Sequence, residues 1–173
     1  LQGFFLRRPI SVCDYDESSI TIIYKVVGQG TDAMTKLKAG DTLDILSGLG
    51  NGFDPAKAGD APLLVGGGVG VPPLFHLAKR LIAAGKKVNV ILGFNKAEEI
   101  FYAEEFKALG ANVTVTTVDG SVGVKGFVTD ALRESGCDYL MACGPTPMLR
   151  ALHKTGVPGQ MSFEERMGCG FGA

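Results

Sequence analysis

From about Asp60 onward, short apolar runs alternate with stretches of helical character, and this alternation constrains the fold more than any other feature of the sequence. The predicted strands cover 62–65, 88–94, 111–118, 139–142 and 160–163, and the predicted helices cover 72–84, 98–109, 128–134 and 147–154. Strands that alternate with helices form a parallel sheet covered on both faces, and ligands bind beyond the carboxyl ends of its strands. The sequence therefore predicts an α/β domain over 61–173 with a five-stranded parallel sheet and helices on both faces.

The first sixty residues follow a different pattern, typical of a small antiparallel structure. Two runs rich in β-branched and aromatic residues, 7–15 and 20–27, are joined by a polar turn at 16–19. A short helix is predicted from about 31 to 37, followed by a third strand over 41–46. Three strands are few for a closed barrel, so residues 1–60 are predicted to form part of an antiparallel β-barrel.

Composition excludes several classes of function. The chain has 173 residues, 46% of them hydrophobic, and its 17 Lys and Arg nearly balance 18 Asp and Glu. A net charge of -1 offers no broad electrostatic surface for nucleic acid or an anionic membrane. No apolar run of about 18 residues and no cleavable leader are present, which predicts no membrane span and a cytoplasmic location. The cysteines are widely spaced and favour neither a disulfide scaffold nor a zinc site.

The strongest local motif is the glycine-rich run 64–74, at a predicted junction between strand and helix. Gly67, Gly68 and Gly70 let backbone amides approach a pyrophosphate, and Pro72 removes only an amide that has no partner in the helix. Val71 replaces the third small residue of the usual dinucleotide fingerprint. The run predicts a phosphate site, and a tight turn without a ligand is the alternative.

A second motif, Cys143-Gly144-Pro145, follows the predicted strand 139–142. A thiol followed by a glycine and a helix-opening proline offers an open platform on which a planar ring can lie. The sequence places no histidine or other base nearby, so Cys143 is not predicted to be a nucleophile. Burial as a small hydrophobic residue is the alternative.

Two elements of the N-terminal sixty residues also suit a nucleotide. In Arg8-Pro9-Ile10-Ser11, the guanidinium matches phosphate oxygens and the hydroxyl can donate to a heteroatom of a ring. The turn with Gly28, Gly30 and Thr31 presents amides at the start of a predicted helix. A solvated strand end is the alternative interpretation of Arg8.

Taken together, these motifs resemble the ferredoxin reductase family, in which a flavin-binding barrel precedes a nicotinamide-nucleotide domain. The segment 8–11 matches that family's R-x-Y-S motif, 28–31 its flavin diphosphate turn, 67–73 its G-G-x-G-x-x-P loop and 143–145 its C-G-P motif. The resemblance implies FAD held by Arg8 and Ser11, and NAD held by the glycine loop with its nicotinamide near Cys143. Ile10 stands where the family has an aromatic residue that stacks on the flavin.

A closer resemblance is to the electron transfer subunits of dihydroorotate dehydrogenase B, carried by segments 6–11, 48–53, 66–74 and 164–173. It implies a [2Fe–2S] cluster whose first ligand is Cys169, and plant-type spacing places the second ligand one residue beyond Ala173. We therefore expect a fragment that cannot hold the cluster by itself and whose flavin pocket is incomplete. The implied partner is an FMN-containing catalytic subunit in a hetero-oligomer that oxidises dihydroorotate to orotate for pyrimidine synthesis.

Two other functions stay open at this point. One is a reductase subunit of a related sulfhydrogenase or ferredoxin-linked transhydrogenase, and the other is a nucleotide-binding module without turnover. No protein side chain is predicted to be catalytic, because the redox chemistry belongs to the cofactors. Both histidines, His76 and His153, are predicted to pack or to face solvent, since neither has a carboxylate at a neighbouring helical position.

Overall fold

The central feature is a parallel sheet, seen in a computed structural model that describes residues 6–132, 135, 137 and 139–163. Within these residues the sheet has six strands in the order β6-β5-β4-β3-β7-β8, all paired in parallel. The strands are β3 (Leu63–Gly67), β4 (Asn89–Phe94), β5 (Asn112–Thr117), β6 (Val124–Lys125), β7 (Leu140–Cys143) and β8 (Gly159–Ser162). The α/β class and the parallel sheet are confirmed.

The predicted number of strands, five, is wrong because β6 was missed. This strand has two residues, Val124 and Lys125, which pair with Thr116 and Thr117 of β5. Two residues are too few to establish an alternation of apolar and polar positions, so no periodic signal marks such a strand.

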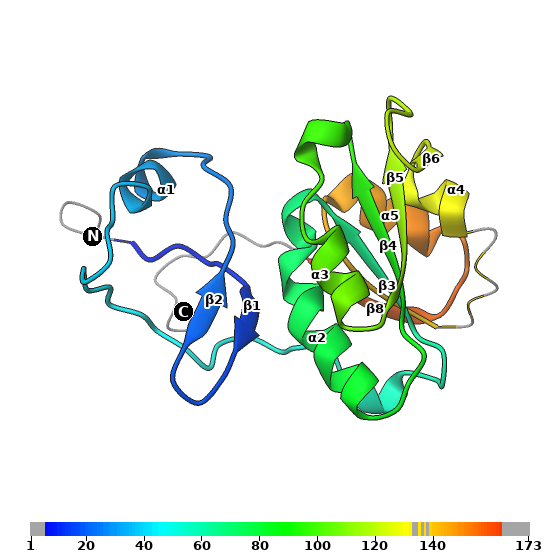
Figure 1. Ribbon diagram of the computed structural model, residues 1–173, viewed down its shortest axis with the longest axis horizontal. Coiled ribbons are helices and arrows are strands. Elements are labelled where there is room, and N and C mark those ends of the chain that lie inside the picture. The colour runs from blue at the N-terminus through cyan, green and yellow to red at the C-terminus, as the bar shows by residue number, and fades with distance from the viewer. Residues whose placement is uncertain (1–5, 133–134, 136, 138, 164–173) are drawn as a thin grey trace.

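Helices cover both faces of the sheet, as predicted. One face carries α2 (Pro72–Ala83) and α3 (Ala103–Ala108), and the other carries α4 (Val128–Leu132) and α5 (Thr146–His153), as Figure 1 shows. Successive strand residues alternate between two apolar cores, because neighbouring side chains of a strand point to opposite faces. Leu64 packs with the α2 and α3 side, whereas Leu63 and Val65 pack with α4 and α5.

The helix predicted over 98–109 is interrupted. A 3₁₀ turn, η3 (Ala97–Glu99), precedes α3, and Tyr102 lies between them with φ 63°. A left-handed backbone at a residue with a Cβ ends regular helix geometry, which explains the break. Further 3₁₀ turns are η1 (Pro55–Lys57) and η2 (Gly68–Gly70).

The N-terminal segment is antiparallel but shorter in its strands than predicted. It contains β1 (Val12–Tyr15), β2 (Ile20–Ile22) and α1 (Gln29–Met34). The predicted strands 7–15 and 20–27 are thus cut short, and the predicted strand 41–46 is irregular chain. Among the described residues β1 and β2 pair only with each other. The segment 41–46 has no neighbouring strand in the described chain with which to form hydrogen bonds, and it therefore stays irregular.

The turn between β1 and β2 is built on Asp16. Its carboxylate accepts hydrogen bonds from the amides and hydroxyls of Ser18 and Ser19, which lower the pKa of Asp16 to about 2. The predicted polar turn at 16–19 is therefore confirmed. In the part of the chain that the structure covers, no helix combines the length and apolar character needed to cross a bilayer.

Phe106 provides a test of the α2 and α3 side of the core. Its side chain is fully buried and meets Phe75 edge-to-face at 5.3 Å between ring centroids. We expect Phe106→Ala to lower the free energy of unfolding by about 3–5 kcal/mol, measured by urea denaturation, because it leaves a cavity. The control Phe127→Ala removes a ring that is 64% exposed and should change stability by less than about 0.5 kcal/mol. Equal losses in the two variants would contradict this packing.

Candidate functional site

The carboxyl ends of β3 and β7 bring two of the predicted motifs into contact. The two strands are neighbours in the sheet, and Gly66 of β3 is in register with Cys143 of β7. A Cβ on Gly70 would overlap the carbonyl oxygen of Cys143 and would lie 2.6 Å from the Cα of Gly144. The glycine turn and the Cys143-Gly144-Pro145 turn therefore touch through their backbones, and this contact requires glycine at position 70.

Gly68 provides the open side of the glycine turn. It has φ +51°, and apart from Gly68 and its two chain neighbours no heavy atom of the described chain lies within 4 Å of the position that its Cβ would take. The amide of Val71 donates to the Gly68 carbonyl at 3.1 Å and closes the 3₁₀ turn directly before α2. Space beside a bare backbone at the N-terminus of a twelve-residue helix suits a phosphate group. The residues here fit the pyrophosphate of a dinucleotide.

Gly67 and Gly144 make room for a residue that the sequence analysis missed, Met148 of α5. A Cβ on Gly67 would lie 2.6 Å from the Met148 sulfur, and one on Gly144 would lie 2.6 Å from its methyl carbon. The side chain of Met148 thus lies between the two turns. Its position three residues after Pro145, in the first turn of a helix, is a signal that could have found it, because helical side chains lean toward the N-terminus. A contact between Gly67 and a phosphate stays a prediction.

Cys143 is only 8% exposed and packs with the core on the α2 and α3 side of the sheet. Gly144 is buried beside it, with φ +159°, whereas Pro145 is exposed at the start of α5. The burial of Cys143 agrees with its alternative interpretation as a small hydrophobic residue. A role beside a nicotinamide ring stays a prediction.

The N-terminal motifs also meet each other. A Cβ on Gly30 would lie 2.6 Å from the guanidinium carbon of Arg8, so glycine at this position leaves space for the arginine. Arg8 also donates to the carbonyl of Leu6. This contact brings a guanidinium to the first turn of α1, an arrangement that fits a diphosphate.

Thr31 holds this turn in shape. It is 7% exposed, and its hydroxyl accepts from the amides of Val27 at 3.0 Å and Gly28 at 3.2 Å while it donates to the Gly28 carbonyl at 3.0 Å. The Gly28 amide is therefore already bonded within the turn. Residues 8–11 precede β1 as irregular chain, where Ile10 is half-buried and Arg8, Pro9 and Ser11 are exposed. The roles of these residues at a flavin stay predictions.

Comparison with known proteins now assigns the family. Residues 64–154 match the family model of the oxidoreductase NAD-binding domain. Over 97% of its length the chain is 47% identical to the dihydroorotate dehydrogenase B (NAD(+)) electron transfer subunits of Bacillus pumilus and Fusobacterium nucleatum, covering 68% and 69% of those proteins. The chain belongs to the family of dihydroorotate dehydrogenase B electron transfer subunits. Its match spans about two thirds of the length of these relatives.

Solved structures show that this member of the electron transfer subunit family has the ferredoxin-reductase-like fold. The structure of an NADH-dependent reduced ferredoxin-NADP oxidoreductase is 34% identical, with a TM-score of 0.83, and the match covers 97% of this chain and 64% of that one. An Amycolatopsis cytochrome P450 reductase shares the fold at 20% identity, with a TM-score of 0.69 over 93% of this chain and 57% of that one. The predicted family resemblance is confirmed.

The predicted metal ligand of the electron transfer subunit, Cys169, lies outside the described residues. Among the residues that are described, no group of three or more His, Cys, Asp and Glu side chains is arranged to hold a metal ion. A cluster at Cys169 stays a prediction.

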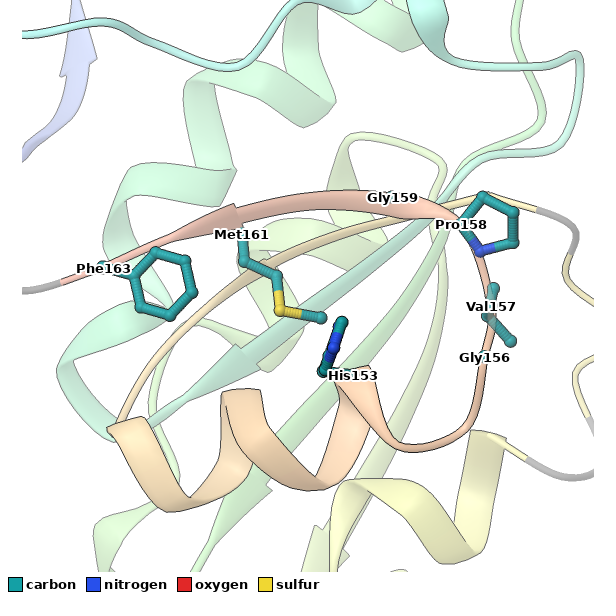
Figure 2. Close-up of a pocket in the computed structure, with 7 residues that line it drawn as sticks. All are labelled: His153, Gly156, Val157, Pro158, Gly159, Met161 and Phe163. Atoms are coloured by element: carbon teal, nitrogen blue, oxygen red, sulfur yellow. The ribbon is translucent and has the colours of Figure 1, made fainter.

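A separate hollow of about 530 Å³ lies between α5 and β8, away from the motifs above. Figure 2 shows His153 of α5 and Met161 of β8 pointing toward one another inside it. His153 is exposed, as predicted, and Phe163 at the end of the hollow is 60% exposed. None of the residues that line this hollow belongs to the predicted nucleotide motifs.

Substitutions at two glycines test the contact between the turns. Gly70→Ala forces a methyl group onto the Cys143 backbone, which cannot move aside, so we expect the dissociation constant for NADH to rise at least about tenfold. Gly67→Ala meets the flexible end of Met148 and also, at 3.2 Å, Cδ of Pro145, so its effect should be milder and should be relieved in part in the double variant with Met148→Ala. Titration of the full-length variants with NADH measures both dissociation constants.

The matched control for these variants is Gly52→Ala, where no described atom lies within 4 Å of the added methyl group. It should bind NADH as the unchanged protein does. If Gly70→Ala binds as tightly as Gly52→Ala, the two turns are not held together as described.

Proposed function

We propose that this chain is the nucleotide-binding part of a cytoplasmic subunit that moves electrons between NAD(H), FAD and a [2Fe–2S] cluster. The electrons come from dihydroorotate, oxidised by an FMN-containing catalytic subunit during pyrimidine synthesis. The single observation that carries the proposal is the contact between Gly70 and Cys143, which joins the two dinucleotide motifs at the carboxyl edge of the sheet. The names of the relatives support the reaction and the partner.

In this proposal the residues around β3 and β7 bind and orient NAD. The open side of Gly68 and the N-terminus of α2 receive the pyrophosphate, because the helix dipole favours negative charge there. The turn at Cys143, Gly144 and Pro145 supports the nicotinamide. Met148, wedged between Gly67 and Gly144, keeps the two halves of the seat at a fixed spacing.

The N-terminal motifs bind and orient FAD in the same proposal. Arg8 bonds a phosphate oxygen, and Gly30 and Thr31 shape the turn beside it. Ser11, three residues after Arg8, hydrogen-bonds the flavin ring. Bound flavin would exchange an electron pair with nicotinamide and single electrons with the cluster, for which Cys169 is the first proposed ligand.

The proposal divides the chain near residue 60, with a flavin-binding part over 1–60 and a NAD-binding part over 61–173. The family model of the NAD-binding domain supports the second part, since its match begins at residue 64. The boundary itself falls between η1 and β3, in irregular chain.

One experiment tests the proposal as a whole. The full-length protein with its partner is assayed for visible absorbance and for NADH-dependent reduction of a dye. We expect flavin bands, a broad cluster shoulder and turnover that depends on NADH. Bound FAD without any dye reduction would favour a nucleotide-binding module instead.

A second candidate rests on the 34% identity to an NADH-dependent reduced ferredoxin-NADP oxidoreductase. Under this alternative the subunit would exchange electrons with ferredoxin rather than with a dihydroorotate-oxidising partner. Supplying dihydroorotate or reduced ferredoxin to the purified complex and following NADH formation separates the two.

Arg8 gives the sharpest prediction for FAD. Removing a charge-assisted hydrogen bond to phosphate costs about 1.5–3 kcal/mol, so Arg8→Ala should raise the FAD dissociation constant of the full-length protein about ten- to a hundredfold. The FAD dissociation constant of Arg8→Lys should lie between those of the unchanged protein and Arg8→Ala, because an ammonium group cannot form two parallel hydrogen bonds to a phosphate. Flavin fluorescence after gel filtration measures the loss. The control Arg80→Ala changes an exposed arginine of α2 and should retain FAD; equal loss in both variants would contradict the role of Arg8.

A further inference from the structure

A carboxylate of β1 bridges two side chains of α2. Asp14 lies 2.8 Å from Nδ1 of His76, and its two carboxylate oxygens accept from Nζ of Lys79 at 2.9 and 2.6 Å. His76 and Lys79 are more than sixty residues away along the chain. The Asp14 side chain is 24% exposed and that of His76 20%, so water screens these contacts only in part. We call Asp14, His76 and Lys79 the β1–α2 clamp.

The neighbours of Asp14 on β1 also contact the helices. The ring of Tyr15 stacks on His76 with centroids 4.0 Å apart, and Cys13 is fully buried with its sulfur hydrogen-bonded to the Tyr102 hydroxyl. Side chains of successive strand residues normally point to opposite faces, but the pairing of β1 with β2 shifts register between Val12 and Asp14. Such an irregularity redirects side chains, which allows the successive residues Asp14 and Tyr15 both to contact His76.

Tyr102 contacts both β1 and α2, and its backbone is strained. It is the only residue other than glycine with a positive φ in the described chain, and such backbone costs about 1–3 kcal/mol unless surrounding contacts hold it. Its hydrogen bond to Cys13 and its partial burial raise the pKa of Tyr102 to about 12. Its ring also meets Phe75 of α2 edge-to-face, with centroids 5.0 Å apart. The strained residue is therefore held by β1 and α2 together.

The clamp links the two nucleotide motifs by a short path made of a few residues of chain on each side and the side-chain contacts between them. Asp14 follows Ser11 by three residues, which is about 10 Å of extended chain. His76 follows Gly70 by six residues, about 9 Å along a helix. A shift of β1 along α2 would thus change the separation of the flavin segment from the dinucleotide turn directly. In Figure 1, the N-terminal segment lies beside the sheet on the side of α2.

We propose that the β1–α2 clamp is a positioning element that fixes the separation of the two nucleotide seats and so sets the rate of electron exchange between them. This inference rests on the function proposed above and adds residues that the motifs do not contain. It assigns no catalytic role to Asp14, His76 or Lys79, which act through the placement of the segments that carry them. Its signature is a loss of rate without a loss of binding.

The charge of Asp14 makes the clamp sensitive to acid. Burial by itself would raise the pKa of Asp14, but hydrogen bonds from His76, Lys79 and the amide of Tyr15 outweigh it and lower the pKa overall. The other ionisable groups facing this junction among the described residues are Tyr15, Cys13, Tyr102 and Glu105. A lowered carboxyl pKa means that the clamp contributes stability above the ordinary pKa of aspartate. That contribution is lost as the pH falls through the lowered value.

Asp14→Asn in the full-length subunit, together with its partner subunit, tests the proposal. We expect dissociation constants for FAD and NADH within about twofold of the unchanged protein, but flavin reduction by NADH in a single turnover about ten- to a hundredfold slower, since small misplacements carry such penalties. Amide hydrogen exchange across Val12–Tyr15 should become faster. In the unchanged protein the protection factor of these amides, which is corrected for the intrinsic pH dependence of exchange, should fall on acidification, and in the variant this fall should be absent.

Two further variants keep the test decisive. Lys79→Met retains the packing of the side-chain stem and the Asp14 contact with His76, so it should fold and show the same changes to a smaller extent. The control Glu104→Gln removes an exposed ion pair with Lys107 and should change neither rate nor exchange.

Two results would overturn the proposal: flavin reduction at the unchanged rate in both clamp variants, or equal loss of binding and of rate. A parent protein that binds neither FAD nor NADH would instead contradict the proposed function. Hydrogen exchange at β1 would still report whether the clamp holds the segment.

Discussion

The close approach of the β3 and β7 turns is the constraint on which the rest of the structure depends. Gly70 lies against the backbone of Cys143, and this contact is possible only because the two strands are neighbours in the sheet and position 70 lacks a side chain. Every element of the proposed NAD seat is positioned by it. The open side of Gly68 precedes α2, and Met148 reaches the gap from α5. The packing of the sheet therefore determines the geometry of the proposed site.

The parallel sheet was predictable because its strong signals are local. Apolar strands of four to six residues and the amphipathic helix α2 each carry their own pattern, and the glycine run marks one junction unambiguously. The weak points were also local. The two-residue β6 has no period, and nothing in the sequence around Tyr102 announces its left-handed backbone. The segment 41–46 has strand-like composition but pairs with no strand in the described chain.

Contacts between residues far apart in the chain could not be predicted from the sequence, for a different reason. His76 was judged by its helical neighbours, whereas its carboxylate partner, Asp14, lies on β1. Met148 lies three residues after Pro145 of the second motif, but its place between Gly67 and Gly144 depends on the approach of two separate turns. Individual motifs can therefore be recognised by residue type and spacing. How they are held relative to one another depends on the tertiary fold.

The order of strands in the sheet carries a consequence for synthesis of the protein. β3 and β4 are consecutive in the chain, whereas Leu63 of β3 pairs with Leu140 of β7. Pairings between residues so far apart form late, because a long loop must close first. A nascent chain can therefore build β3, β4 and β5 on the ribosome while its dinucleotide seat is still missing one wall. The proposed NAD seat is therefore complete only after β7 has been synthesised and docks beside β3.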